Sequence, residues 1–198
     1  MTVSVAPVTP DRWDDLVSLF GPNGAYSHCW CAYFRVRAKD YSASVSCQPP
    51  HRGRANRDLL ERITRDGAVP GLLAYDEGKP VGWVSVSPRD QFARILVSRT
   101  TGLTNQDETD VWSIVCFWLP AHRRRSGIGT TLLAAAVEFA RSGGASVVEG
   151  YPVDTAGERH RGADVYTGTV GMFRSAGFSI AAHPASGRPI ARLLMDGH

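Results

Sequence analysis

Hydrophobic side chains are densest at residues 111–119, where both alternations of an extended segment are apolar. A strand of this kind is covered on both faces, which places it in the middle of a sheet. After a glycine turn, apolar residues recur with helical spacing over 128–140, and the predicted helix ends at Gly143. Residues 145–151 predict the next strand, parallel to the first because a helix connects the two.

Two amphipathic helices are predicted in the first third of the chain. Residues 2–8 alternate apolar and polar side chains and predict a strand, after which Thr9 offers an N-cap with Pro10 at the first helical position. A second helix is expected to end near Gly67. The apolar stripes of the two helices are Trp13, Leu16, Val17 and Phe20, and Ala55, Leu59, Leu60 and Ile63.

The remaining predicted strands form hairpins. Residues 71–75 and 81–86 flank a glycine turn, and residues 178–182 and 190–195 flank a second turn at 184–187. Residues 92–97 are compatible with a short helix or a strand, and residues 102–110 are compatible with a polar loop. The pattern over 21–53 assigns no element.

Composition indicates one globular domain. The 198 residues are 43% hydrophobic and 21% charged, which is ordinary for a folded protein, so we expect a single domain over residues 1–198. The net charge of +3 is too small to indicate a nucleic-acid partner. The longest apolar run, 114–119, is shorter than a bilayer span, and the first residues lack a secretory signal. We therefore expect a cytoplasmic protein without a membrane partner.

The four cysteines are expected to be reduced thiols. Cys29 and Cys31 form a C-x-C pair, whereas zinc sites use pairs separated by two to four residues. Cys47 and Cys116 do not supply the second pair that a zinc site needs. We predict no metal.

The segment from Arg124 to Gly129 has the properties of an anion site. A helix N-terminus leaves backbone N–H groups unpaired, glycines let an anion approach them, and arginine adds forked donors. A Walker loop is absent, because no lysine follows residue 79. The dinucleotide motif G-x-G-x-x-G lacks its third glycine, since Leu132 stands there, but Glu149 keeps a Rossmann-type nucleotide enzyme open as an alternative.

The motif Arg-x-x-Gly-x-Gly between a strand and a helix resembles the coenzyme A loop of the GNAT N-acetyltransferase superfamily. Residues 172–178, which end in Gly-Phe, resemble the last helix of that family and its exit. The resemblance covers roughly residues 70–185. It implies an α/β (α+β) fold with a mixed, mostly antiparallel central sheet, one parallel strand pair and flanking helices. It also implies direct transfer of an acetyl group from acetyl-CoA to a primary amine in a ternary complex.

In the family, the loop amides bind the pyrophosphate of acetyl-CoA and the preceding strand pairs with the pantetheine arm. A main-chain N–H of that strand, here within 117–119, meets the thioester carbonyl. The residues expected to contact coenzyme A are Phe117, Trp118, Leu119, Arg124, Arg125, Ser126, Gly127, Ile128, Gly129 and Thr130.

The general base is predicted to be Glu149 or Tyr151. These residues lie two apart on a strand, so they share a face, and the parallel strands should splay around the thioester near them. Glu108 and Asp110, at the entry of the central strand, are the second choice, and a base acting through water is the third.

The general acid is left open. Members of the family often carry a tyrosine four residues before the glycine of the exit, and Phe173 stands there. Either Tyr166 or Tyr151 supplies the proton, or the thiolate leaves unaided, which a thiol pKa near 8 to 9 permits.

The acceptor is expected to be a small-molecule amine. Aromatic and thiol side chains gather over residues 26–34, and Tyr26, Trp30 and Tyr33 are the predicted substrate contacts. Glu149 and Asp154 would suit a cationic amine. A non-catalytic acyl-CoA-binding regulatory domain is the second alternative, and a homodimer is left open.

Overall fold

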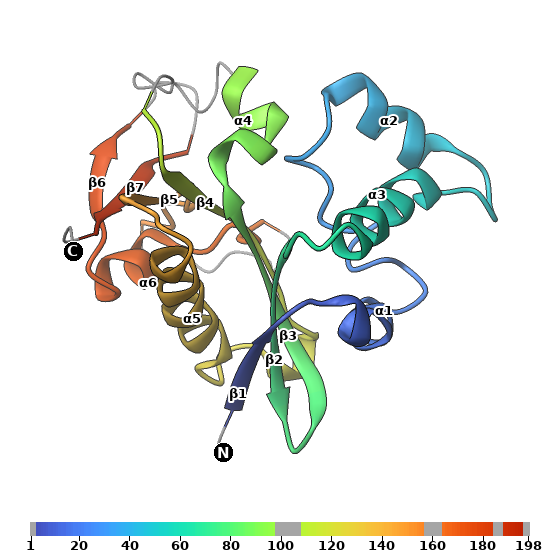
Figure 1. Ribbon diagram of the computed structural model, residues 1–198, viewed down its shortest axis with the longest axis horizontal. Coiled ribbons are helices and arrows are strands. Elements are labelled where there is room, and N and C mark those ends of the chain that lie inside the picture. Colours follow the sequence, from blue (N-terminus) through green and yellow to red (C-terminus); the bar gives the residue numbers. More distant parts are fainter. Residues whose placement is uncertain (1–2, 98–107, 157–163, 184–187, 196–198) are drawn as a thin grey trace.

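A seven-stranded sheet runs through the computed structural model of the protein, which describes residues 3–97, 108–156, 164–183 and 188–195 (Figure 1). The strand order is β1-β2-β3-β4-β5-β7-β6, and every neighbouring pair is antiparallel except β4 and β5. The strands are β1 (Val3–Pro7), β2 (Gly71–Asp76), β3 (Lys79–Pro88), β4 (Val111–Trp118), β5 (Val147–Gly150), β6 (Ser179–Ala182) and β7 (Ile190–Leu194).

This topology confirms the mixed, mostly antiparallel fold with one parallel pair. It contradicts the Rossmann-type alternative, because a dinucleotide-binding sheet is mostly parallel with helices on both faces of parallel strands. β2 and β3 form the hairpin predicted from the glycine turn. The turn lies at Glu77 and Gly78, both of which have positive φ. The second predicted turn, at 184–187, lies outside the described residues, and so does most of the loop predicted at 102–110.

The helices lie on both faces of the sheet (Figure 1). One face is covered by α5 (Ile128–Ser142) with α6 (Val170–Ser175), and the other by α1 (Trp13–Phe20) with α3 (Arg54–Arg65). In β4, Ile114 belongs to the core under α5 and Val115 to the core under α1. The fully apolar strand is therefore central, as predicted.

The first two helices differ in detail from their predicted stripes. Thr9 does not cap α1: a 3₁₀ turn over Pro10–Arg12 intervenes, and the Thr9 hydroxyl donates instead to the Asp11 carboxylate. Thr9 and Pro10 therefore take the predicted N-cap and first helical positions, but of the 3₁₀ turn that leads into α1, and the Thr9 side chain makes no capping hydrogen bond. In α3 the buried residues are Asn56, Leu60 and Thr64, whereas Ala55 is exposed.

The segment that the pattern left unassigned contains tight turns and the helix α2 (Ala38–Ser46). Five non-glycine residues in the turns have positive φ, which L side chains rarely adopt: Ala25, Ser27, His28, Trp30 and Cys31. Only Ser44 of α2 is buried, so the helix carries no apolar stripe for a pattern to detect. The short helix α4 (Ala93–Val97) follows β3.

β4 is irregular along both of its edges. Ser85 pairs with Cys116 but Val86 pairs with Ile114, so Val115 forms a bulge in β4. On its other edge β4 pairs with β5 only over 111–114, and β4 continues to Trp118 without that partner. The carboxyl-terminal half of β4 therefore presents a free edge toward the interior.

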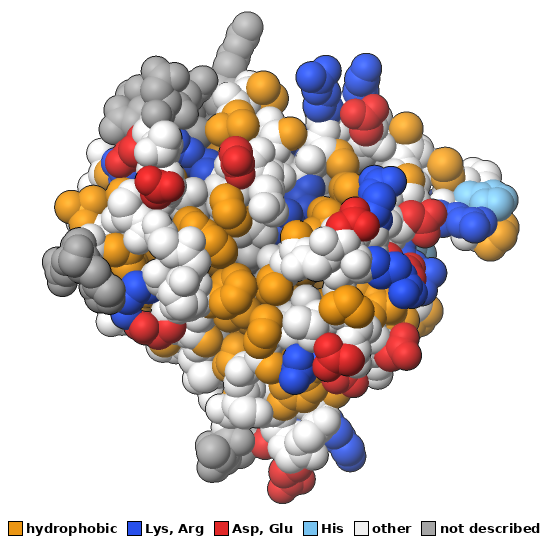
Figure 2. Space-filling view, in the orientation of Figure 1, with side chains coloured by type: hydrophobic (Ala, Val, Ile, Leu, Met, Phe, Trp, Pro, Cys, Tyr) orange, Lys and Arg blue, Asp and Glu red, His pale blue; other side chains and the backbone are white. Residues whose placement is uncertain are grey.

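The surface carries charges of both signs. On the face seen in Figure 2, basic and acidic side chains are interspersed over α2 and α3, with hydrophobic side chains gathered in the middle of the face. No helix within the described residues is both long and apolar enough to cross a membrane.

Candidate functional site

A cavity of about 880 Å³ opens at the free edge of β4. One part of its wall comes from the end of β4 and the start of α5: Cys116, Phe117, Trp118, Leu119, Ala121, Arg124, Arg125 and Gly129. The rest comes from the turns after α1, from α2 and from the segment leading into α6: Tyr26, Cys29, Cys31, Tyr33, Phe34, Tyr41, Val165, Tyr166, Gly168, Thr169 and Met172. The cavity thus joins the predicted coenzyme A loop to the predicted aromatic and thiol cluster.

The loop has the geometry of an anion site. Gly127 stands in the N-cap position of α5 with φ of 85°, and no side chain caps the helix. Amides of the first turn are therefore available to a phosphate, and the helix dipole favours negative charge there. Arg124 is exposed and donates through Nε to the Leu119 carbonyl oxygen at 3.2 Å, which holds its stem beside β4.

Gly129 is the residue of the first turn of α5 that lines the cavity. A Cβ added at this position would meet its nearest protein atom, Met172 Sδ, at 3.7 Å, which is an ordinary contact. The packing of the protein therefore does not require glycine here. The missing side chain leaves space on the cavity side, where a pyrophosphate could approach the amides.

The predicted coenzyme A residues divide into two groups. Phe117, Trp118, Leu119, Arg124, Arg125 and Gly129 line the cavity. Ser126 and Thr130 are exposed, and Gly127 sets the turn, but these three do not line it. The side chain of Ile128 is 1% exposed and lies against Gly82 in the core, so only its backbone is available to a ligand.

The free edge of β4 is bridged by the segment before α6. The Phe117 N–H donates to the Tyr166 carbonyl oxygen at 2.6 Å. This bond takes the place of the missing β5 partner and holds Tyr166 at the wall of the cavity. Burial raises the pKa of Tyr166 to about 12, against an opposing effect of the Arg188 guanidinium, whose centre lies 4.8 Å from the ring centroid. The hydroxyl is therefore a protonated donor at neutral pH.

Phe173 is a core residue. It is fully buried, and its ring meets Phe178 edge to face at 4.9 Å and Phe117 at 6.4 Å. A Cβ on Gly150 would come within 2.1 Å of the Phe173 ring, so glycine is required for this packing. Phe173 does not line the cavity, whereas Tyr166 does.

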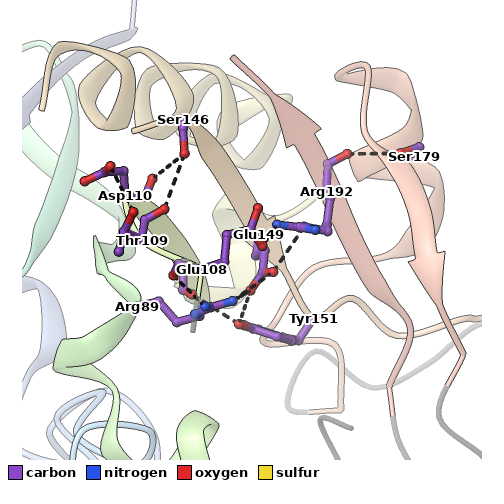
Figure 3. Close-up of polar contacts among 10 residues, drawn as sticks. Arg89, Glu108, Thr109, Asp110, Ser146, Glu149, Tyr151, Ser179 and Arg192 are labelled. Carbon is purple, nitrogen blue, oxygen red and sulfur yellow. Dashed lines mark hydrogen bonds and ion pairs between the residues drawn. The ribbon is translucent and has the colours of Figure 1, made fainter. Parts of the chain in front are cut away.

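Glu149 and Tyr151 lie in a buried polar cluster rather than at the cavity (Figure 3). Arg89 Nη1 donates to the Glu149 carboxylate at 3.3 and 3.4 Å, and Arg192 Nε lies 3.2 Å from Oε1. The Tyr151 hydroxyl donates to Oε2 at 3.0 Å and lies 3.1 Å from Ser113 Oγ. Burial, followed by the charge of Glu149, raises the pKa of Tyr151 well above its ordinary value. The two residues share a face, as predicted, and this face meets arginines.

The other carboxylates considered from the sequence also lie away from the cavity. The Glu108 carboxylate pairs with Arg192, and its carbonyl oxygen accepts from Arg89 at 3.0 Å (Figure 3). Asp110 precedes the first residue of β4, whereas the cavity lies at the last. Asp154 is exposed, and its carboxylate accepts from the Ala156 N–H at 3.0 Å.

Two of the three predicted substrate contacts line the cavity, namely Tyr26 and Tyr33. Trp30 does not, because its ring is buried against Trp13 and Phe20. Sequence reasoning missed Tyr41 as a wall residue, since it lies on the unpredicted helix α2. Tyr166 was considered only as a general acid, and the turns around it carry no periodic signal.

Three thiols meet at the cavity. Cys31 Sγ lies 3.1 Å from Cys116 Sγ although the two residues are 85 apart in the chain, and Cys29 lines the same wall. All four cysteines are free. The pKa values of Cys29 and Cys31 are raised, first by hydrogen bonds between neighbouring thiols and then by burial. Within the described residues, no three His, Cys, Asp or Glu side chains are arranged to hold a metal ion.

Comparison with known proteins gives one family. The model of the acetyltransferase (GNAT) family matches residues 30–162. No curated protein sequence matches the chain.

Solved structures share the fold at low sequence identity. The PaiA N-acetyltransferase from Thermoplasma acidophilum in complex with coenzyme A has a TM-score of 0.56 and 11% identity, over 98% of this chain and 100% of its own. The ribosomal-protein-alanine N-acetyltransferase from Brucella melitensis has a TM-score of 0.51 and 18% identity, over 97% and 99%. YncA from Salmonella typhimurium, solved with acetyl-CoA, has a TM-score of 0.51 and 13% identity, over 100% and 96%.

Proposed function

The chain belongs to the acetyltransferase (GNAT) family, and we propose that it transfers an acetyl group from acetyl-CoA to the primary amine of a small molecule. The amine attacks the thioester directly in a ternary complex, without an acyl-enzyme. The observation that carries this proposal is the single cavity that joins an uncapped, arginine-flanked helix N-terminus to an aromatic chamber at the free edge of β4. The two substrates can therefore meet at that edge.

The donor side of the cavity fits coenzyme A. The amides of the first turn of α5, with Arg124 and Arg125, would hold the pyrophosphate, and the open position at Gly129 gives it access. The edge of β4 at 117–119 would pair with the pantetheine arm. Coenzyme A supplies the activated acyl group, and the chain supplies binding and orientation.

A backbone donor for the thioester oxygen is available at the same edge. The Phe117 N–H already donates to Tyr166, and strand geometry turns the N–H of every second residue to the same side. We therefore assign the oxyanion contact to the Leu119 N–H rather than to Phe117. One donor of this kind is worth on the order of 3 kcal/mol in the transition state.

Tyr166 is our choice for the general acid, because it lines the cavity and its backbone carbonyl is bonded to β4. Burial raises its pKa to about 12, which keeps the hydroxyl protonated but makes it a weaker acid than an ordinary tyrosine. The hydroxyl would donate a proton to the departing thiolate. Phe173, at the position where the family often has tyrosine, has no proton to give.

The general base stays a prediction. The buried positions of Glu149 and Tyr151 favour a positioning role, in which their cluster with Arg89 fixes β5 beside β4. Within the described residues no carboxylate lines the cavity. An amine that binds in its neutral form needs only water to carry away its proton after attack, and this is the mechanism we favour.

Calorimetry and a turnover assay test the proposal together. Acetyl-CoA should bind the protein in calorimetry while NAD does not, and an amine panel should contain an acceptor that releases free coenzyme A with first-order dependence on enzyme. Binding of acetyl-CoA without turnover over a broad panel would favour the regulatory alternative. Absence of acetyl-CoA binding would contradict the assignment of the loop. The predicted cytoplasmic location and the homodimer stay predictions.

A further inference from the structure

The acceptor side of the cavity is apolar and aromatic. We use the name acceptor chamber for the part of the cavity wall that is formed by the three thiols and by Tyr26, Tyr33, Phe34, Tyr41, Val165 and Tyr166. Neither an acidic nor a basic side chain belongs to this part, within the described residues. The charges of the cavity wall are those of Arg124 and Arg125, on the coenzyme A side.

Two arginines lie against rings of the chamber wall. The guanidinium of Arg94 lies 4.0 Å from the ring centroid of Tyr33 and 5.6 Å from that of Tyr41, and Arg188 lies against Tyr166. Arg94 Nε and Nη2 are buried and find no hydrogen-bond partner in the described parts of the chain. Arg188 donates to the Thr167 hydroxyl. Among the described residues neither arginine forms an ion pair with a carboxylate, and both guanidinium groups lie against rings of the chamber wall.

A second, smaller cavity of about 500 Å³ shares Tyr26 and Tyr41 with the chamber. Its wall adds Arg52, His28 and Asn23 but no acidic residue. Both cavities that meet at these tyrosines therefore lack negative charge in their described walls. This differs from the sequence-based expectation of a cationic acceptor, which depended on Glu149 and Asp154, two residues that lie elsewhere.

A second positive charge on the acceptor would be costly in this chamber. Moving an ammonium group out of water is unfavourable unless a carboxylate or hydrogen bonds compensate it, and the nearby guanidinium groups repel it. Aromatic faces can attract cations, but Arg94 already lies over the rings of Tyr33 and Tyr41, and its charge would repel a second cation there. The same conditions lower the pKa of the reacting amine, because burial and nearby positive charge both disfavour its protonated form. The chamber thus selects the neutral amine, which is the nucleophile.

We propose that the acceptor is a primary monoamine on an aromatic body, with no second positive charge, and that Arg94 helps to exclude di- and polyamines. This inference rests on the proposed function. The aromatic body would pack against the tyrosine rings, and offset or edge-to-face ring pairs add roughly 0.5 to 1.5 kcal/mol beyond their buried area.

The test compares amines of matched reactivity. With saturating acetyl-CoA, tyramine or 2-phenylethylamine should show a kcat/KM at least about 100-fold above the value for spermidine or a simple diamine such as 1,4-diaminobutane, which corresponds to about 2.7 kcal/mol. Calorimetry of tyramine against the complex with free coenzyme A provides a readout that does not depend on turnover. A higher kcat/KM for spermidine, or equal values for both classes, would overturn the inference.

Arg94 is tested by its own variant and a matched control. Arg94→Met should raise the kcat/KM for the diamine relative to that for tyramine by about tenfold, because removing the cation lowers the repulsion. Arg57→Met removes an arginine that also lies over aromatic rings, those of Trp13 and Trp30, but outside the chamber, and should leave the ratio unchanged. An equal ratio in Arg94→Met and wild type would contradict the role of Arg94.

Folding of the variant and its binding of acetyl-CoA are measured alongside activity. If Arg94→Met does not fold, as thermal unfolding would reveal, Tyr41→Leu takes its place and should raise the KM for tyramine several-fold. Acetyl-CoA affinity is measured in parallel by calorimetry. If the wild-type protein does not bind acetyl-CoA, the proposed function itself is contradicted. If it binds acetyl-CoA but prefers polyamines as acceptors, only the proposed acceptor class is contradicted.

Discussion

The backbone N–H of Phe117 donates a hydrogen bond to the carbonyl oxygen of Tyr166 at 2.6 Å, across the gap where β5 no longer pairs with β4. This bond closes part of the free edge of the central strand. It also holds the backbone of Tyr166, a residue of the cavity wall, beside β4. A residue from the segment before α6 thereby stands next to the backbone donors of β4.

Tyr166→Phe should lower kcat while leaving the affinity for acetyl-CoA unchanged. Removing a general acid typically costs about 100- to 10,000-fold. We expect the low end, about 100-fold, because a thiolate with a conjugate-acid pKa near 8 to 9 is already a fair leaving group. The backbone bond to Phe117 does not involve the ring, so the fold should be preserved. Steady-state kinetics and acetyl-CoA calorimetry check both parts.

The pH profile provides a sharper check on Tyr166. Because burial raises its pKa to about 12, the hydroxyl keeps its proton over the whole range from pH 6 to 10 and loses it only as the pH approaches 12. The wild-type rate should therefore show no alkaline decrease due to Tyr166 below about pH 10. Tyr75→Phe, which removes a hydroxyl that donates to Asp15 outside the cavity, is the control and should leave kcat unaltered. Equal rates for Tyr166→Phe and wild type would exclude the general-acid role.

Gly129→Ala should weaken acetyl-CoA binding without destabilising the protein. Alanine is the better helix former by up to about 1 kcal/mol, and the nearest protein atom to its Cβ would lie 3.7 Å away. The methyl group would fill the space that the cavity wall leaves for the pyrophosphate. We expect acetyl-CoA affinity to fall at least about tenfold, as when one hydrogen bond to a charged group is lost.

Gly171→Ala is the matched control for this change. Gly171 is also a helical glycine, in α6, with no atom within 4 Å of its added Cβ, and it does not line the cavity. Calorimetry and thermal unfolding of both variants should separate a binding defect from a folding defect. A Gly129→Ala protein that binds acetyl-CoA as tightly as Gly171→Ala would contradict the pyrophosphate assignment.

Glu149→Gln should act on stability rather than selectively on catalysis. The carboxylate is 2% exposed and faces two arginines, so the neutral amide would leave buried positive charge poorly compensated. Breaking a buried ion pair in this way costs about 3 to 5 kcal/mol in the free energy of unfolding. Glu138→Gln, in a surface pair with Arg141, should change it by less than about 1 kcal/mol. Urea denaturation measures both.

The kinetic consequence of Glu149→Gln decides between two roles. A positioning residue affects the chemistry only through the geometry of β5, so kcat should fall modestly and the shape of the pH profile should be retained. If Glu149 is instead the general base, the Glu149→Gln enzyme should lose most of its kcat and the acidic limb of its pH profile while its fold stays intact. The second result would restore the catalytic assignment predicted from the sequence.

The central elements could be predicted because their signals are local. β4 is apolar on both alternations, and α5 repeats its apolar residues between two glycine signals, so one window of sequence defines each element. The coenzyme A loop lies between them and was located for the same reason. In contrast, α2 buries only Ser44 and offers no stripe, so its cavity residue Tyr41 could not be found.

The catalytic assignments depended on contacts between distant segments. Alternation correctly put Glu149 and Tyr151 on one face, where they bond to each other. It could not reveal that Arg89, 60 residues earlier, and Arg192, from β7, meet the same face and bury the carboxylate. The position of Tyr166 likewise follows from a hydrogen bond between segments 49 residues apart.

The thiol pair at the cavity combines a rigid and a strained segment. Cys116 belongs to the central strand, whereas Cys31 is the last of the five non-glycine residues with positive φ in the turns after α1, with a φ of 49°. Their Sγ atoms are 3.1 Å apart, and a disulfide bond of about 2 Å requires a shift of about 1 Å. A disulfide here would tie the wall of the acceptor chamber to the edge of β4.

Oxidation with diamide should therefore join Cys31 to Cys116 and lower activity. The two thiols lose their hydrogens to the oxidant, so the protein mass should fall by about 2 Da, and dithiothreitol should restore both mass and activity. Because the pKa of Cys31 is raised, its thiolate is scarce at neutral pH, and the reaction should accelerate from pH 7 to pH 9. Peptide mapping identifies the joined residues. Cys31→Ser and Cys116→Ser should resist inactivation, whereas Cys47→Ser, which changes an exposed thiol, should behave as wild type. If diamide still inactivates Cys31→Ser and Cys116→Ser, the assignment of the disulfide to this pair is contradicted.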